Sequence, residues 1–244
     1  MPIEIGSVEA IFRYPVKSMR GERLDAATLG WHGIEGDRRL AFRRLNNRSG
    51  FPWLSATKLP DLLLFTPELR AGGADGLLPT HACTPDGARL PIFSAVLAAE
   101  VEERCGEPVQ MMQLRQGIFD DATISVIASN TVDEICRLAE CQLDVRRFRP
   151  NILVRALRPV AFQEDTWLGG VLSFGGGENA PAVAVTMRDI RCAMINLDPD
   201  SASSSPQMLK AVVRANANNA GVYGTVTRTG QLAAGQTITL HWAT

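Results

Sequence analysis

Four short segments of the 244-residue sequence carry side chains suited to binding an anion or a metal, next to residues typical of turns and strand ends. They are YPVKS (14–18), GIEGDRR (33–39), RFRPN (147–151) and RCAM (191–194). Lys17 and Ser18 follow a proline that fixes the approach of the chain, so an ammonium and a hydroxyl group could converge on one phosphate oxygen. Arg38 lies in a glycine-flanked turn, and its guanidinium offers a fork of donors that matches phosphate. The pattern predicts a local anion site.

The third segment carries two arginines. Arg147 and Arg149 are two residues apart, which would place them on the same side of an extended chain, and Pro150 favours an extended Arg149. A structural alternative, strongest for Arg147, is that such arginines bridge carboxylates. Arg149 is therefore the better candidate for contact with an anion.

Cys192 is the candidate metal ligand. A thiolate is a soft metal ligand, and the nearby cations Arg188 and Arg191 would favour the ionised sulfur. A free cysteine more often packs as a small apolar residue. We assign that role to the other four cysteines, Cys83, Cys105, Cys136 and Cys141.

The elements that must position these groups are mostly short strands. Runs rich in β-branched residues, separated by turn-forming residues, predict strands over 8–12, 39–45, 62–66, 125–127, 152–154, 182–186, 223–227 and 237–242. Several runs alternate apolar and polar residues, as in Thr237 to Leu240, so one face is buried and one is wet. This pattern is typical of a β-barrel or sandwich.

Helices are fewer. One is predicted from near Asn130, with Thr131 and Glu134 as a capping box. A second covers 94–105 and ends at Gly106. A third follows Ser205 as N-cap with Pro206 in its first turn. Strands with interspersed helices predict an α+β fold. A soft boundary near residue 110 divides it into a 1–110 β-barrel-like module and a second domain over 111–244.

Five motifs follow one another along the chain: YPVKS, GIEGDRR, LSATKLPDLL, RFRPNILV and RCAMINLDPD, with GVYG and GQTITL after them. Together they resemble the MOSC family, named for the C-terminal domain of molybdenum cofactor sulfurase, with the N-terminal β-barrel extension found in the mitochondrial amidoxime reducing component. The resemblance covers nearly the whole chain. It implies a β-barrel-rich MOSC fold with a few packed helices and a bound molybdenum cofactor, Mo-molybdopterin.

Carried onto matching positions, the resemblance implies that Lys17, Ser18 and Arg38 hold the cofactor phosphate. It makes Cys192 both the metal ligand and the catalytic residue. Further cofactor contacts are assigned to Ser55, Thr57, Asp121, Ser129, Asn130, Arg147, Arg149, Asn151 and Arg191. A helix N-terminus at Ser129 and Asn130 would point free N–H groups at an anion, although plain helix capping explains these two residues almost as well.

The resemblance implies a molybdenum-dependent oxidoreductase that reduces N-hydroxylated compounds, with the hydroxyl oxygen leaving as water. Electrons would come from a separate protein of ferredoxin, flavodoxin or cytochrome type. The alternative is a carrier of molybdenum cofactor or sulfur that bears a persulfide on Cys192; a third reading is an interaction barrel without cofactor. Met19, where a cysteine is common, and Met194, where the run after the cysteine usually contains threonine, depart from the reductase pattern.

The composition narrows the classes of function that remain. The 25 Lys and Arg balance 26 Asp and Glu, so nothing draws the chain to nucleic acid or an acidic membrane surface, and a small-molecule substrate is expected. Without an apolar run of roughly 18 residues or a signal peptide, we expect a cytoplasmic protein. Cys136 and Cys141 have plant-type iron–sulfur spacing, but Asp144 stands where the third cysteine would be, so we expect no iron–sulfur cluster in this chain.

Overall fold

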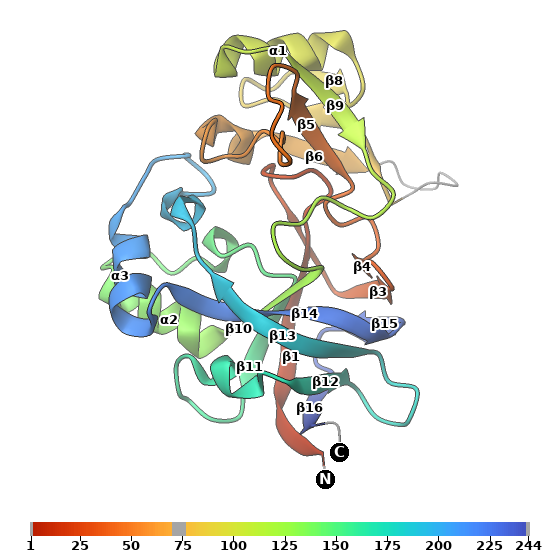
Figure 1. Cartoon of the computed structure of the whole chain (residues 1–244), viewed down its shortest axis with the longest axis vertical. Coiled ribbons are helices and arrows are strands. Elements are labelled where there is room, and N and C mark those ends of the chain that lie inside the picture. Colours follow the sequence, from red (N-terminus) through yellow and green to blue (C-terminus); the bar gives the residue numbers. More distant parts are fainter. Residues whose placement is uncertain (1, 70–76, 243–244) are drawn as a thin grey trace.

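The computed structural model describes residues 2–69 and 77–242, and within them seven strands close into a barrel (Figure 1). In order around the barrel they are β11 (Ile152–Ala156), β10 (Ile124–Ala128), β14 (Asn219–Arg228), β13 (Ala182–Ile190), β12 (Gly170–Phe174), β16 (Thr237–Trp242) and β1 (Ile3–Arg13). β1 closes the barrel by pairing with β11, and β2 (Glu22–Leu24) extends it beyond β1. β10 and β11 run parallel, and the other barrel pairs are antiparallel.

The barrel is filled by the apolar residues that alternate along its strands. On β16, Ile238 and Leu240 point inward with Leu172 and Phe174 of β12 and Val8 of β1. All five are almost fully buried. Burial of each such side chain contributes about 1.5–3 kcal/mol, so the alternation that predicts a strand also stabilises the barrel.

Smaller sheets lie beyond one end of the barrel, at the top of Figure 1. β5 (Leu40–Arg44) pairs with β9 (Val109–Gln113), and a second sheet joins β6 (Thr66–Leu69), β7 (Pro79–Cys83) and β8 (Arg89–Pro91). With α1 (Ala95–Cys105) and the 3₁₀ helix η1 (Pro60–Leu64) they enclose a separate apolar cluster. A third sheet of β15 (Gly230–Ala233), β3 (Ala26–Gly30) and β4 (Gly33–Ile34) flanks the barrel.

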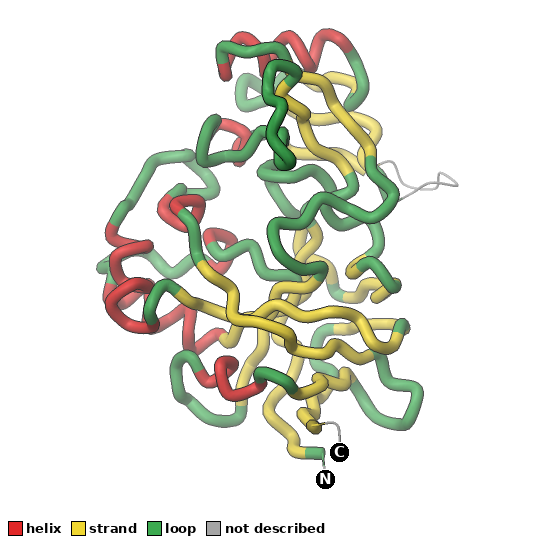
Figure 2. Tube along the Cα trace, viewed as in Figure 1, coloured by secondary structure: helices red, strands yellow, loops and turns green. Residues whose placement is uncertain are grey.

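Two helices pack together on the outside of the barrel, to one side of its strands (Figure 2). They are α2 (Ser129–Leu138) and α3 (Gln207–Asn216). Three 3₁₀ helices complete the description: η2 (Val145–Arg147), η3 (Gln163–Trp167) and η4 (Ala193–Asn196). No helix in 2–69 or 77–242 is long and apolar enough to cross a membrane.

The predicted α+β class and barrel are confirmed, and so is the helix over 94–105. The Ser94 hydroxyl accepts from the Leu97 N–H at 3.1 Å, and Gly106 ends the helix with a φ of 73°. The strand predicted over 62–66 is wrong, because Pro60 starts a 3₁₀ turn there and β6 begins only at Thr66. β1 belongs to the N-terminal part of the chain yet is a strand of the large barrel, and the division near residue 110 stays a prediction.

The capping box predicted for α2 is also wrong. Thr131 is fully buried inside the helix. Its hydroxyl donates to Glu164 Oε2 at 2.8 Å and accepts from the Phe162 N–H at 2.7 Å. Thr131 therefore ties α2 to η3 rather than capping the helix. The third helix begins at Gln207 with Pro206 as N-cap, one residue later than predicted, and without a side-chain cap from Ser205.

Glu164 gives the protein a predictable pH dependence. Burial raises the pKa of Glu164 to about 7 from 4.5, against opposing hydrogen bonds that include those from Thr131 and Ala128. Between these values the folded state binds a proton that the unfolded state has lost, so this group makes stability fall as pH rises. We expect Glu164→Gln to flatten the fall in unfolding free energy between about pH 5 and pH 7, measured with urea. An unchanged pH slope, equal to that of the exposed-site control Glu103→Gln, would contradict this.

Candidate functional site

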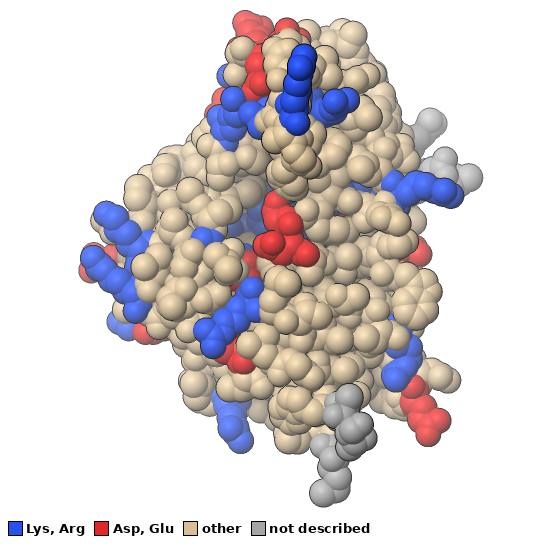
Figure 3. All heavy atoms as spheres, in the orientation of Figure 1, with Lys and Arg blue, Asp and Glu red and all other residues tan. Residues whose placement is uncertain are grey.

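A cavity of about 310 Å³ lies where segments from both parts of the chain meet. Ten of the thirteen predicted site residues line it: Lys17, Ser18, Arg38, Ser55, Thr57, Asp121, Arg147, Arg149, Arg191 and Cys192. Figure 3 shows this face hollowed near its middle, with cationic atoms inside the hollow beside acidic ones. Five of the lining residues are cationic and three are acidic, so the formal charge of the lining favours an anion.

Three of the cationic or hydroxyl-bearing residues have a backbone conformation that side chains rarely adopt. The φ angles of Ser18, Arg38 and Arg149 are 65°, 48° and 50°. Such left-handed residues cost about 1–3 kcal/mol each and persist only where surrounding structure holds them. The extended conformation predicted for Arg149 is thus wrong. The chain from Val145 to Arg147 is a 3₁₀ turn, and Arg149 follows it in the left-handed conformation.

A buried network lies beneath Arg38. Asp37, which is 1% exposed, accepts from the Tyr14 N–H at 2.7 Å, from Asn151 Nδ2 at 3.0 Å and from the Arg38 guanidinium. Asn151 Oδ1 in turn accepts from Arg38 at 3.3 Å and from the Ser125 N–H at 3.1 Å. Burial alone would lower the pKa of Arg38, but the charge of Asp37, its hydrogen bond and the nearby Tyr14 and Tyr223 together raise that pKa. Asn151 therefore positions Arg38 from below and does not line the cavity.

The ring of Tyr14 supports two of the arginines. The guanidinium carbons of Arg149 and Arg38 lie 4.1 and 4.9 Å from its centroid. Burial raises the pKa of Tyr14 to about 12 and lowers that of Arg149 to about 10, so Arg149 stays cationic at neutral pH. Arg149 NH1 donates to the Met19 carbonyl at 2.8 Å, whereas its buried NH2 has no hydrogen-bond partner among the described residues.

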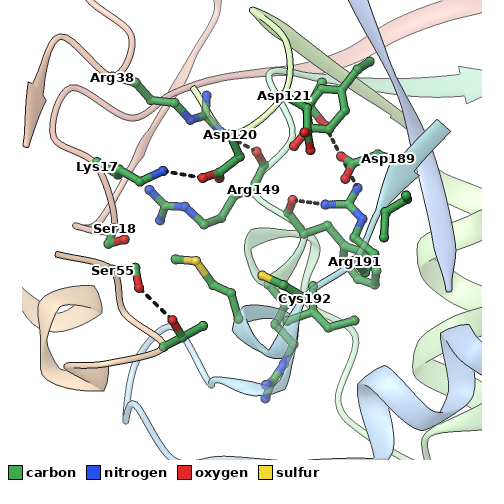
Figure 4. Close-up of a pocket in the computed structure, with 18 of the residues that line it drawn as sticks. Lys17, Ser18, Arg38, Ser55, Asp120, Asp121, Arg149, Asp189, Arg191 and Cys192 are labelled. Carbon is green, nitrogen blue, oxygen red and sulfur yellow. Dashed lines mark hydrogen bonds and ion pairs between the residues drawn. The ribbon is translucent and has the colours of Figure 1, made fainter. Parts of the chain in front are cut away.

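Lys17 enters the cavity beside Arg38 and Arg149 (Figure 4). Its ammonium contacts Asp120 Oδ1 at 2.6 Å and lies 5.0 Å from the centroid of the Phe51 ring. Burial lowers the pKa of Lys17, and Asp120 opposes that shift. The Lys17 side chain is 6% exposed and that of Asp120 is 61% exposed, so the carboxylate is a solvated counterion for a buried cation.

Cys192 is exposed, and its thiol faces the cavity (Figure 4). It lies between β13 and η4, in an extended conformation that begins the 3₁₀ turn. Arg191 fixes this segment, because its guanidinium donates to the carbonyls of Ala220 at 2.7 Å and Phe148 at 2.8 Å and lies 2.9 Å from Asp189. Arg188, predicted to favour the thiolate, pairs instead with Asp165 at 3.5 Å and does not line the cavity.

Arg147 both pairs with a carboxylate and lines the cavity, so it fits each of the two predictions made for it. Its NH2 donates to Asp198 at 2.7 Å and its NH1 to the Asn196 carbonyl at 3.2 Å, which is the carboxylate pairing of the structural alternative. It also lines the cavity, and its buried Nε has no partner within the described chain. Ser55 and Thr57 line the cavity with their hydroxyl oxygens 2.6 Å apart.

Ser129 and Asn130 are not brought to this cavity. Ser129 Oγ donates to the Val154 carbonyl at 3.4 Å, and both residues line other hollows around α2. The reason is that α2 packs on the outer surface of the barrel, against α3. The free N–H groups at its start are therefore not positioned as the anion hypothesis requires.

Sequence reasoning did not assign several other residues that line the cavity to the site, namely Phe51, Ser125, Phe148, Asp189, Ile190, Met194, Ile195 and Tyr223. Asp189 is 2% exposed and accepts from Ser125 Oγ at 2.9 Å. Burial raises its pKa to about 6, against the opposing effects of Arg191 and Ser125. Its position three residues before Cys192 was the available signal, as was the GVYG motif for Tyr223.

The lining of the cavity suits the phosphate of a molybdenum-bearing pterin in particular. Buried nitrogens of Arg147 and Arg149 that have no partner among the described residues are donors that an anionic group would satisfy. The exposed thiol of Cys192 shares this space. Within 2–69 and 77–242, no group of three or more His, Cys, Asp or Glu side chains could hold a metal ion. The residues thus fit a phosphate-bearing group and offer a metal one thiolate.

Comparison of the chain with models of protein families gives two matches. The model of the MOSC domain matches residues 87–239, and that of the MOSC N-terminal beta barrel domain matches residues 5–122. No curated protein matches the chain. The solved YUAD protein from Bacillus subtilis is similar over 100% of both chains, with a TM-score of 0.51 and 16% identity, which supports the fold. The YiiM structure from Geobacillus stearothermophilus matches 49% of this chain and 54% of its own, with a TM-score of 0.38 and 18% identity.

The two family matches together reach from residue 5 to residue 239, which is nearly the whole chain. They confirm the predicted MOSC fold with its N-terminal β-barrel module. The closer likeness to the mitochondrial amidoxime reducing component stays a prediction. On these matches the chain belongs to the MOSC family, which is associated with the molybdenum cofactor.

Proposed function

We propose that the chain binds a molybdopterin-type molybdenum cofactor in this cavity and reduces N-hydroxylated compounds with electrons from a separate donor protein. One observation carries the proposal: the exposed thiol of Cys192 shares a cavity with the cations Lys17, Arg38 and Arg149. An anion-binding wall facing a single free thiol is the arrangement that an anionic cofactor with a thiolate-ligated metal requires.

The chain's own groups divide between the two ends of the cofactor. Lys17, Arg38 and Arg149 would hold its phosphate, with Ser18 as a hydroxyl donor. Asp120 is largely solvated, so an incoming phosphate could replace it as the partner of Lys17. The buried network beneath Arg38 and the ring of Tyr14 hold the arginines in place before any anion arrives, which lowers the cost of binding.

Cys192 would supply one metal ligand, and the remaining ligands would come from the pterin and from solvent. When bound, this cofactor supplies two-electron redox chemistry. Reduction of an N–OH group to N–H consumes two electrons and two protons and releases water. Asp189, whose pKa burial raises to about 6, places a protonatable carboxyl in the cavity wall. Ile190, which is 66% exposed, and Met194 offer apolar contacts to the organic part of a substrate.

Cofactor loading tests the proposal. We would express the full chain in a host that makes molybdenum cofactor and measure molybdenum and pterin per chain. Wild type should carry both in stoichiometric amounts. Arg149→Gln should bind the cofactor about tenfold more weakly, since it loses a charged donor to the phosphate. Arg155→Gln, at an exposed position on β11, is the matched control and should load like wild type.

Turnover completes the test. Loaded wild type should reduce a simple amidoxime with reduced viologen as electron source. A wild-type protein that stays free of metal and pterin in that host would overturn the cofactor assignment. A loaded protein without turnover, with sulfane sulfur on Cys192, would overturn the reductase and favour the carrier.

A further inference from the structure

A second, smaller cavity of about 160 Å³ is lined by four arginines and the hydroxyl-bearing Tyr14. The arginines are Arg20, Arg23, Arg146 and Arg149. Arg149 is the one lining residue that it shares with the cofactor cavity, and no acidic side chain is among the described residues that line it. The space is several times the roughly 30 Å³ that one water occupies in the liquid, so it can hold an oxyanion.

Two residues that line this cavity each carry a buried donor with no partner among the described residues. The first is the hydroxyl of Tyr14, a residue only 2% exposed. The second is Nε of Arg20, whose other two nitrogens donate to Asp200 at 3.1 Å and to the Pro199 carbonyl at 3.3 Å. A buried donor without an acceptor costs about 1–3 kcal/mol, so both groups call for a ligand that accepts hydrogen bonds.

The surrounding charge favours an anion. Asp200 bridges Arg20 and Arg146, and Asp144 also pairs with Arg146, which compensates these two cations. The side chain of Arg23 makes no ion pair or hydrogen bond within the described chain, and Arg149 has no carboxylate partner there. Two cations thus remain without a counterion around the phenol of Tyr14. A tetrahedral oxyanion can accept from guanidinium and phenol donors that approach from several directions.

We propose that this second cavity binds phosphate, held by the Tyr14 hydroxyl, Arg20 and Arg23, at a site separate from the cofactor cavity but next to it through the shared Arg149. The phosphate could be free or part of a monoester. A neighbouring hollow shares Phe12, Arg23 and Arg146 and continues along the apolar Leu143 and Val145, so an apolar ester group has a place to lie.

Calorimetric titration of the full chain with inorganic phosphate and with phenyl phosphate, at constant ionic strength, tests this. We expect saturable binding to wild type and about tenfold weaker binding to Tyr14→Phe, which loses one hydrogen bond to a charged group but keeps the ring beneath Arg149. Arg23→Gln should also weaken binding. Lys17→Gln alters a residue that lines only the cofactor cavity, so it should keep the phosphate binding that depends on Tyr14. Arg155→Gln, which lines neither cavity, should bind as wild type does. Tighter binding of phenyl phosphate would assign a monoester, and equal binding would assign free phosphate.

A stability measurement separates this role from a structural one. Without phosphate, Tyr14→Phe should unfold at the same temperature as wild type or a higher one, because it removes an unpartnered buried hydroxyl. With phosphate, wild type should gain more stability than the variant, a comparison that cancels the general stabilising effect of phosphate salts. The proposal is overturned if wild type shows no saturable binding, or if binding is lost in Lys17→Gln but kept in Tyr14→Phe and Arg23→Gln.

Discussion

Cys192→Ser should lower kcat/KM for reduction of an N-hydroxylated substrate by about 100-fold or more, since loss of a group that merely supports a metal ligand already costs 10–100-fold. The pterin should stay bound, because the cations that would hold its phosphate lie on other segments. The thiol is exposed and makes no hydrogen bond within the described chain, so the substitution should leave the fold intact. Steady-state kinetics on cofactor-loaded protein is the measurement.

The matched control for this variant is Cys83→Ser, on β7 and outside the cavity, which should keep full activity. X-ray absorption at the molybdenum edge should show one sulfur ligand fewer in Cys192→Ser and no change in Cys83→Ser. Activity within a few-fold of wild type, with an unchanged sulfur count, would show that Cys192 is not the ligand.

Local signals were enough to predict many of the elements. The strand over 237–242 is found with its predicted bounds, because its alternation is read directly as one buried and one exposed face. Helix α1 begins after Ser94, whose hydroxyl caps it, and ends at Gly106, which adopts a left-handed conformation. Both signals involve only near neighbours in the sequence. The 62–66 run failed because a short apolar segment is compatible with several conformations, and the preceding Pro60 favoured a tight turn.

The candidate site was predictable as a set of residue types but not as an arrangement. Lys17, Arg149 and Cys192 stand in separate motifs, and their convergence follows from the way β1, β10, β11 and β13 meet in the barrel. Contacts between distant residues decide the finer roles. Asn151 is turned towards Asp37, 114 positions away, and so it supports Arg38 instead of facing the cavity.

The backbone of the site explains why its support must be strong. Ser18, Arg38 and Arg149 each occupy a left-handed conformation, and each lines the cavity. Relaxation of any of them would release strain and carry its side chain away. Arg38 is held by Asp37 and Asn151, and it donates to the Arg149 carbonyl at 3.1 Å. The hydrogen bonds of one buried carboxylate therefore help to maintain two strained arginines.

Asp37→Ala should consequently lower the unfolding free energy by about 3–5 kcal/mol, the cost of leaving a buried charge without its partner. The substitution leaves three donors without their shared acceptor: the guanidinium of Arg38, the N–H of Tyr14 and Nδ2 of Asn151. Urea denaturation should show a lower midpoint with an unchanged slope. Asp25→Ala, at an exposed position, is the control and should change stability by less than about 0.5 kcal/mol. If Asp37→Ala were as stable as this control, the network would not be what holds Arg38, and the preorganised anion site would need another support.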